Sequence, residues 1–170
     1  MESRARAARV AVYAALATGL YMAESVLPGP LPWLRIGVAN VGVVLALYDI
    51  GAGAAAVAVG IKLVLGSLLL GRLLTPFFWL GAAGSLAGLA LMVLVKTVAG
   101  RVVGPVGASA AGGVGHNLGQ LAAARLLMLP GTAAAALMPV MMLTGTVSGT
   151  AVGLLVRLVQ LRLSESDRAA

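Results

Sequence analysis

Three polar side chains lie close together in a stretch that is otherwise glycine and aliphatic, GGVGHNLGQL at residues 112–121. His116 and Gln120 are four residues apart, so they share one face if the stretch is helical, and Asn117 lies beside them. An imidazole and two carboxamides donate and accept hydrogen bonds, which is the chemistry needed to orient a bound solute. The alternative is that they only join neighbouring helices, a common role for polar side chains in membrane proteins.

The composition around this stretch indicates an integral membrane protein. The 170 residues are 61% hydrophobic and 10% charged, and they include no cysteine. This composition differs from that of water-soluble domains and from that of disordered chains. The formal charge is +7, but the basic residues stand singly between apolar runs, so we expect no nucleic-acid partner. The absence of cysteine excludes disulfides and thiolate metal sites.

The apolar runs predict an all-α fold, a polytopic membrane helix bundle with about six transmembrane helices. A run of about 20 residues is needed to cross a hydrocarbon core about 30 Å thick. Prolines and glycines separate the runs, and all of them belong to one predicted transmembrane domain over residues 1–170. The predicted spans are 9–27, 36–50, 52–71, 76–96, 106–128 and 133–159. The second span is short, so we expect it to be tilted, kinked or partly buried.

The distribution of lysine and arginine predicts that both termini face the cytoplasm. Basic residues are retained on the cytoplasmic side of membrane helices, and six crossings place both termini on one side. Most of the twelve basic residues then lie inside, namely Arg4, Arg6, Arg9, Lys96, Arg101, Arg157, Arg162 and Arg168. Glu24 and the prolines after it replace the small-residue cleavage site of a signal peptide, so the first span is expected to remain in the mature protein.

Four basic residues fall in the outer half of the predicted bundle, namely Arg35, Lys62, Arg72 and Arg125. Glu24 is the one acid there. A charge near the middle of a bilayer costs at least about 2.5 kcal/mol on insertion scales, so an anionic partner is expected to offset it. Lys62 is the clearest case, because it lies near the middle of its span and cannot easily extend to water. The arginines have the alternative role of anchoring the helices at lipid headgroups.

We therefore expect an outward-facing pocket that binds a small, anionic solute. Its predicted ligand-binding residues are Arg35, Asn40, Lys62, His116, Asn117 and Gln120. Glu24, Arg72 and Arg125 are predicted near its mouth. For Asn40 and Asn117, a purely structural role between helices is the competing interpretation.

Small residues recur at helical spacing in several spans, which permits close contact between helices. Gly145, Gly149 and Gly153 form the most specific series and predict internal packing of the last span. A second row, Ala7, Ala11 and Ala15, lies in the first span. It favours either internal packing or a docking surface for a partner.

Little in the sequence suits catalysis. The two aspartates, Asp49 and Asp167, are predicted at the cytoplasmic edge and His116 deep in the membrane, so they cannot form a serine triad. One histidine without cysteine gives no zinc site, and we expect no metal or cofactor. No G-x-x-x-x-G-K-[ST] loop is present, so any ATP-driven step would need another chain.

Three stretches carry a resemblance to a known family: LPWLRIGVANVGVVLAL (31–47), the run from Lys62 through GRLLTPFFWLGAAGSLAGLALM (71–92), and GGVGHNLGQLAAARLL (112–127). They resemble the bacterial membrane family known as Gx transporter or heptaprenyl diphosphate synthase component I, over about residues 9–160. Its members are similar to the S components of energy-coupling factor vitamin transporters. Those are six-helix proteins of the bacterial cell membrane that hold a small molecule near the outer face.

The resemblance also implies partners. S components associate with a membrane coupling subunit and two ATPases, and an alanine row on their first helix contacts the coupling subunit. The row Ala7, Ala11 and Ala15 matches that description. Partners expected for this chain are thus a small anionic solute or prenyl diphosphate-like ligand, membrane lipid, and these subunits.

The two family names imply different functions. Catalytic prenyl diphosphate synthases resemble one another in paired aspartate-rich motifs, which bridge Mg²⁺ ions to diphosphate. This chain has no such motif, so we do not expect it to make a prenyl chain. Three hypotheses remain: an S-component-like solute-binding transport protein, a noncatalytic membrane subunit of isoprenoid or quinone metabolism or of a flavin and quinone electron-transfer assembly, and a scaffold whose polar residues only join helices.

Overall fold

The computed structural model describes residues 2–26 and 37–169, which form an all-α bundle without strands. The helices are α1 (Glu2–Ser25), α2 (Asn40–Asp49), α3 (Ala52–Leu69), α4 (Pro76–Leu127) and α5 (Gly131–Ala169). Helix α4 bends at Gly104, so it consists of a first arm (76–103) and a second arm (105–127). With these two arms the bundle has six helical segments, and the predicted all-α fold is confirmed.

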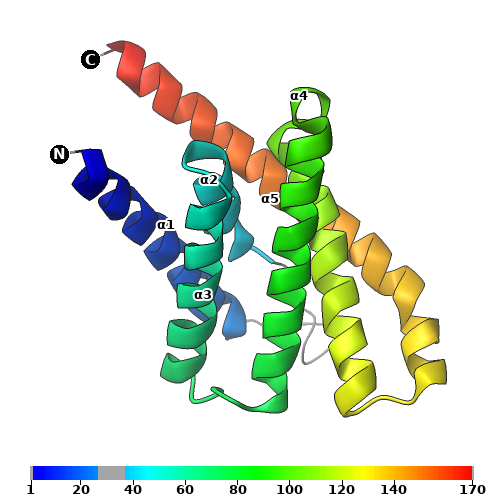
Figure 1. The fold of residues 1–170 in the computed structure, drawn as a ribbon. Coiled ribbons are helices and arrows are strands. Elements are labelled where there is room, and N and C mark those ends of the chain that lie inside the picture. The colour runs from blue at the N-terminus through cyan, green and yellow to red at the C-terminus, as the bar shows by residue number, and fades with distance from the viewer. Residues whose placement is uncertain (1, 27–36, 170) are drawn as a thin grey trace.

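Successive segments run in opposite directions (Figure 1). Both termini, the turn at Gly51 and the bend at Gly104 lie at one end, which we name the termini end. The turns over 70–75 and 128–130 lie at the other, which we name the loop end. Short connections explain this arrangement, because a helix joined to the next by a few residues packs beside it in the antiparallel sense.

The bend in α4 follows from a glycine-proline pair. Gly104 has φ 53° and ψ −172°, a conformation that glycine adopts readily and other residues do not. Pro105 then begins the second arm, where a missing N–H is tolerated. The sequence predicts a loop over 97–105, between two membrane spans. In the structure the chain stays helical up to residue 103. Glycines in a helix interior lower its stability without ending it, because neighbouring helices support them.

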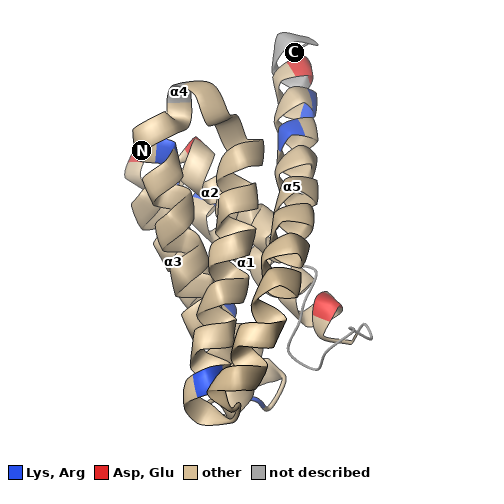
Figure 2. Ribbon diagram, turned by 90° about the vertical axis from the view of Figure 1, so that its right-hand side faces the viewer, with Lys and Arg blue, Asp and Glu red and all other residues tan. Residues whose placement is uncertain are grey.

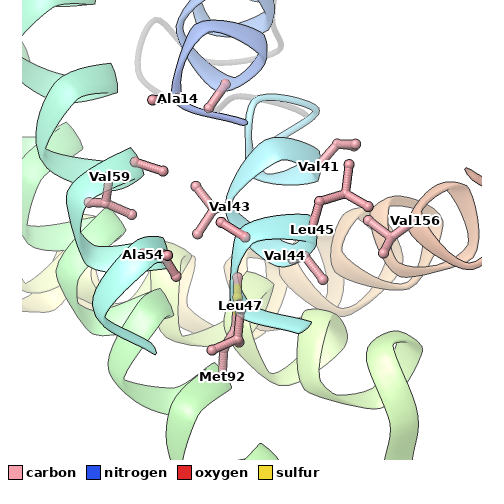
Figure 3. Packing of buried hydrophobic residues seen from close by; sticks show 14 of the residues in the cluster. Ala14, Val41, Val43, Val44, Leu45, Leu47, Ala54, Val59, Met92 and Val156 are labelled. Carbon is pink, nitrogen blue, oxygen red and sulfur yellow. The ribbon is translucent and has the colours of Figure 1, made fainter. Parts of the chain in front are cut away.

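Helix α2 is short and central. Each residue from Val41 to Leu47 is buried, and side chains from all four other helices surround this helix. Figure 3 shows Ala14 of α1, Val59 of α3, Met92 of α4 and Val156 of α5 around it. Ten residues at 1.5 Å each make a helix about 15 Å long, half the thickness of a hydrocarbon core. Burial against its neighbours therefore replaces the length that a lipid-facing helix needs.

Glycines bring α4 and α5 into close contact. A Cβ atom at Gly149 would lie 2.4 Å from the carbonyl oxygen of Ser109, and one at Gly145 would lie 2.6 Å from that of Gly113. Gly153 packs equally closely on Val106. The predicted packing of the last span through this glycine series is confirmed, and a larger residue at these positions would separate the two helices.

Several helices have the length and composition of membrane spans. Within the described residues, three qualify: Ala52–Leu69, Pro76–Gly100 and Gly131–Glu165. Figure 2 shows Lys and Arg mainly near the two ends of the bundle, with long uncharged stretches between them. The chain is thus a membrane protein.

Candidate functional site

Polar side chains from several helices converge on a small cavity. Its volume is about 30 Å³, which leaves room for about two water molecules. The polar side chains that line it are Tyr21, Glu24, Asn40, Lys62, Arg72, Ser85, His116 and Gln120. Within residues 2–26 and 37–169, no group of His, Asp or Glu side chains could hold a metal ion. The chemistry available is therefore charge and hydrogen bonding.

Lys62 is the most completely buried charged residue of the site. Its side chain comes from the inward face of α3, where Ala55, Ala58, Val59 and Ser67 are also buried. Lys62 is 2% exposed, and its Nζ donates a hydrogen bond of 3.0 Å to Oδ1 of Asn40, the first residue of α2. The site thus contains a cationic side chain inside an apolar bundle, where burial of a charge is costly.

Glu24 lies at the start of α2, where backbone N–H groups have no partner within the helix. Its carboxylate accepts hydrogen bonds from the backbone N–H groups of Gly37 and Ala39, the latter at 3.5 Å. Glu24 itself is 7% exposed. A carboxylate at the N-terminus of a helix is stabilised by the partial positive charge there. Glu24 thus fixes α1 to the start of α2.

Tyr21 lines the cavity from α1 and contacts a serine of α3. The hydroxyl groups of Tyr21 and Ser67 lie 3.3 Å apart, and both residues are buried. Gly66 makes room for the ring, because a Cβ atom there would lie 2.6 Å from Cδ1 of Tyr21. The glycine is therefore required where the aromatic ring packs on α3.

His116 and Gln120 reach the cavity from the second arm of α4. Gly84, on the first arm, lets them approach, because a Cβ atom there would lie 2.7 Å from Cγ of Gln120 and 3.1 Å from Cε1 of His116. Ser85 is adjacent on the first arm, lines the same cavity and is 5% exposed. The shared face inferred from the spacing of four residues is present.

The cavity approaches the surface at the loop end. Arg72 lies in the turn between α3 and α4, where Gly71 and Leu74 have positive φ angles of 63° and 62°. Its guanidinium is half-buried, and none of the ion pairs between described residues involves it. Phe77, beside it in the lining, is 45% exposed. A cation and an aromatic ring thus stand at the rim of the cavity.

Two predicted residues, Asn117 and Arg125, are not among those that line the cavity. Asn117 is buried, but its amide donates to the carbonyl oxygen of Met141 at 2.7 Å and to Oγ1 of Thr144 at 3.1 Å. It therefore joins α4 to α5, the structural alternative considered for it. Arg125, predicted near the mouth, is exposed in the last turn of α4. Arg35 lies outside the described residues.

Other lining residues were not predicted as part of the site. Tyr21 lies three residues before Glu24 on α1, and Ser85 lies four residues after Gly81 on α4. Residues three or four apart share one face of a helix, so Tyr21 lies on the same face as Glu24, and Ser85 on the same face as Gly81. This spacing was the one signal in the sequence. A hydroxyl group in a membrane helix is too common for that signal to stand out, since serine and tyrosine often bond a neighbouring helix.

The alanine row of α1 points away from the cavity. Ala7, Ala11 and Ala15 are all exposed, while the buried residues of the helix, such as Ala14 and Ala17, lie on another face. An open groove between α1 and α3 includes Ala7, Ala11 and Ile61. Internal packing, the other explanation for the row, does not apply in this chain.

The family was identified by comparison with known proteins. No curated protein and no solved structure matches the chain. A family model described as heptaprenyl diphosphate synthase component I matches residues 13–159, most of the described helices. The word component denotes one subunit of a larger assembly. The chain therefore belongs to the heptaprenyl diphosphate synthase component I family.

Proposed function

We propose that the chain captures a small anionic solute in this cavity, from the outer face of the membrane, and passes it inward together with partner subunits. The observation that carries the proposal is Lys62, a cationic side chain that is 2% exposed and lines a cavity together with other polar groups. An anion in the cavity would neutralise its charge. Arg72 at the rim would attract such a solute before it enters.

The polar groups around Lys62 would orient the solute. Asn40, His116 and Gln120 offer donors and acceptors on the walls of the same cavity. With room for about two water molecules, the cavity is too small for a vitamin-sized molecule. Binding therefore requires the helices to separate around it, as expected for a protein that releases its solute on the other side.

The proposed orientation places the loop end outside and both termini in the cytoplasm of a bacterial cell. Arg4, Arg6 and Arg9 lie at the start of α1, and Arg157 and Arg162 near the end of α5, so the termini end is rich in basic residues. Because the chain has no cysteine, T132C at the loop end and S164C near the C-terminus can be labelled singly in intact cells. An impermeant maleimide should label T132C and spare S164C; the reverse pattern contradicts this orientation.

The exposed face of α1 is the proposed contact for a membrane coupling subunit. Small side chains at Ala7, Ala11 and Ala15 allow a second helix to approach closely. The groove toward Ile61 extends this surface onto α3. In the proposed assembly the coupling subunit joins the chain to two ATPases, which supply the energy that this chain cannot.

A second candidate function follows from the family description. A noncatalytic membrane subunit of isoprenoid or quinone metabolism would hold a prenyl diphosphate in the same cationic cavity. A third, more distant role is in a flavin and quinone electron-transfer assembly. Each of these ligands is anionic or polar at one end, so the cavity alone does not separate them.

The deciding experiment is identification of the small molecules that copurify with the protein. The chain is purified in detergent, and bound molecules are identified by mass spectrometry beside the K62M variant. A water-soluble anion lost from K62M supports solute capture, whereas a polyprenyl compound supports the second function. A protein that is empty of any bound molecule contradicts both and leaves a scaffold.

A further inference from the structure

A second, smaller cavity lies beside the first. Its volume is about 10 Å³, and the polar side chains that line it are Asn40, Ser109 and Ser148. These side chains come from three helices, α2, α4 and α5. Gly37 and Asn40 line both cavities. Because its side chain borders both spaces, Asn40 forms part of the wall between them.

The second arm of α4 shows how the two cavities follow one another along the bundle. Ser109 and Gly113 line the smaller cavity. His116 and Gln120, further along the same arm, line the larger one. Successive members of this set are four, three and four residues apart, so all of them share one face of the helix. Ser109 follows shortly after the bend at Gly104, so the smaller cavity lies nearer the termini end.

The smaller cavity has the size and the polar groups of a water site. One buried water molecule needs a space of about 10–15 Å³ and two to four polar partners. Ser109 is 1% exposed, and none of the hydrogen bonds between described residues involves its hydroxyl group. Buried hydroxyl groups are nearly always hydrogen-bonded, either to protein or to ordered water. A water molecule in the cavity would satisfy the hydroxyl of Ser109.

The other two polar residues provide further partners for that water. Oδ1 of Asn40 accepts the hydrogen bond from Nζ of Lys62 at 3.0 Å, and the N–H groups at the other end of the amide are donors. The hydroxyl of Ser148 donates to the carbonyl oxygen of Gly145 at 3.3 Å and can accept a second hydrogen bond. One water molecule can therefore bond to three helices at the point where α2 begins.

We propose that the smaller cavity holds one ordered water molecule, and that the side chain of Asn40 separates this water from the larger cavity. Asn40 then bonds Lys62 on one side of the wall and the water on the other. The water site itself does not depend on the proposed function. Its further role does rest on that function: the water marks the next polar position on the inward route of the solute.

A single cysteine at position 109 tests the wall, because the chain has no native cysteine. Purified S109C is exposed to Ag⁺, a thiol-reactive ion small enough for a water-sized cavity, in chloride-free buffer. After free Ag⁺ is removed and the protein is denatured, a maleimide labels the thiols that Ag⁺ did not reach. We expect Ag⁺ to block N40A/S109C at least about tenfold faster than S109C, because a buried thiol otherwise reacts only when the structure around it opens.

N117A/S109C is the matched control. Asn117 is a buried amide of the same arm that bonds α5 and is not among the residues that line either cavity. Its removal loosens the contact of α4 with α5 and leaves the wall in place, so blocking should stay as slow as in S109C. Equal acceleration in both double variants, or none in N40A/S109C, overturns the role of Asn40. If N40A does not fold, N40S/S109C takes its place.

The water is tested separately. A crystal structure that shows ordered water should place one molecule about 2.7–3.2 Å from Oγ of Ser109. In solution, S109A should lower the melting temperature relative to S164A, an exposed serine-to-alanine change in α5, because the water loses a partner. An S109A protein at least as stable as S164A indicates that an unsatisfied hydroxyl was removed from a dry cavity, which overturns the water site.

None of these measurements uses the solute, so they can fail independently of the proposed function. Slow blocking of N40A/S109C, together with a copurifying anion that K62M loses, supports solute capture and overturns the wall. Fast blocking of N40A/S109C in a protein without any copurifying molecule supports the two cavities and contradicts solute capture. The melting temperature of each variant shows whether its fold is intact.

Discussion

Both ends of the bundle contain a lysine that is withdrawn from open water, but their surroundings differ. At the termini end, Nζ of Lys96 donates to the carbonyl oxygen of Leu47 at 2.6 Å and lies 4.8 Å from the centre of the Tyr48 ring. It thus bonds the last turn of α2, where carbonyl groups have no partner within the helix. Toward the loop end, Lys62 bonds a side-chain amide at the wall of a cavity.

The difference extends to the neighbouring groups. Around Lys96, the hydroxyl of Tyr48 donates to the carbonyl oxygen of Gly104 at 2.8 Å, and Arg9 and Tyr13 both bond Asp49. These contacts join α2 to α1 and α4. Around Lys62, the polar groups line a common space. Lys96 thus completes a helix end, whereas Lys62 borders a cavity.

Lys62→Met provides the strongest test of this comparison. Methionine removes the cost of burying a charge and also the hydrogen bond to Asn40, so its two effects on folding oppose each other. Solute binding, by contrast, loses its main attraction. We expect affinity to fall more than about tenfold, equivalent to about 1.4 kcal/mol, with a smaller change in melting temperature than in K96M. Binding is measured by retention of the copurifying molecule; a K62M protein that retains it as well as the unmodified chain contradicts the functional reading of this lysine.

Lys96→Met should give the opposite result. It removes a charge-assisted hydrogen bond from the end of α2, so we expect a loss of about 1.5 kcal/mol in the free energy of unfolding. Thermal unfolding in detergent measures the loss, and solute retention should stay the same. If K96M lowers solute retention and leaves the melting temperature unchanged, Lys96 and not Lys62 acts in binding, and the proposed roles of the two lysines are wrong.

Tyr48→Phe should have a smaller effect on stability. It deletes the hydrogen bond to Gly104 and keeps the ring beside Lys96, for an expected loss of about 1 kcal/mol. Hydrogen exchange at amides near the bend of α4 should rise. Tyr21→Phe is the matched change beside the cavity, and greater destabilisation by Y21F would show that hydroxyl groups there matter more to the fold than those at the termini end.

Arg9→Gln should have the smallest effect. The arginine side chain is 57% exposed and that of Asp49 is 31% exposed, with a separation of 3.2 Å. Exposed ion pairs are screened by solvent, so we expect a change of no more than about 0.5 kcal/mol. A loss above 1.4 kcal/mol, as from a buried pair, would mean that the contact of α1 with α2 at this end is stronger than its exposure implies.

The residue pattern anticipated part of this architecture. Apolar runs and the glycine series predicted the all-α fold and the packing of α5, because both depend on local composition and spacing. The polar residues Lys62, His116 and Gln120 were expected to converge, and they do line one cavity. Whether any of them binds a ligand remains a prediction.

Other features depend on the rotation of one helix against another, which spacing does not encode. Asn117 differs from His116 by one residue, or about 100° around the helix, and this rotation directs its amide to α5. The partner of Lys96 is a backbone carbonyl, which carries no sequence signal. The sequence predicted that the span containing α2 is short. It did not predict that α2 is fully buried, because that burial depends on contacts with four other helices.

The shortness of α2 has a consequence for passage across the membrane. Its first residue, Asn40, forms part of the cavity wall, and its last, Asp49, meets Arg9 at the termini end. Ten residues separate these points by only about 15 Å. In the proposed transport, a molecule beside Asn40 would have about half of the hydrocarbon core still to cross. Sideways displacement of the three-turn helix α2 would open that remaining distance.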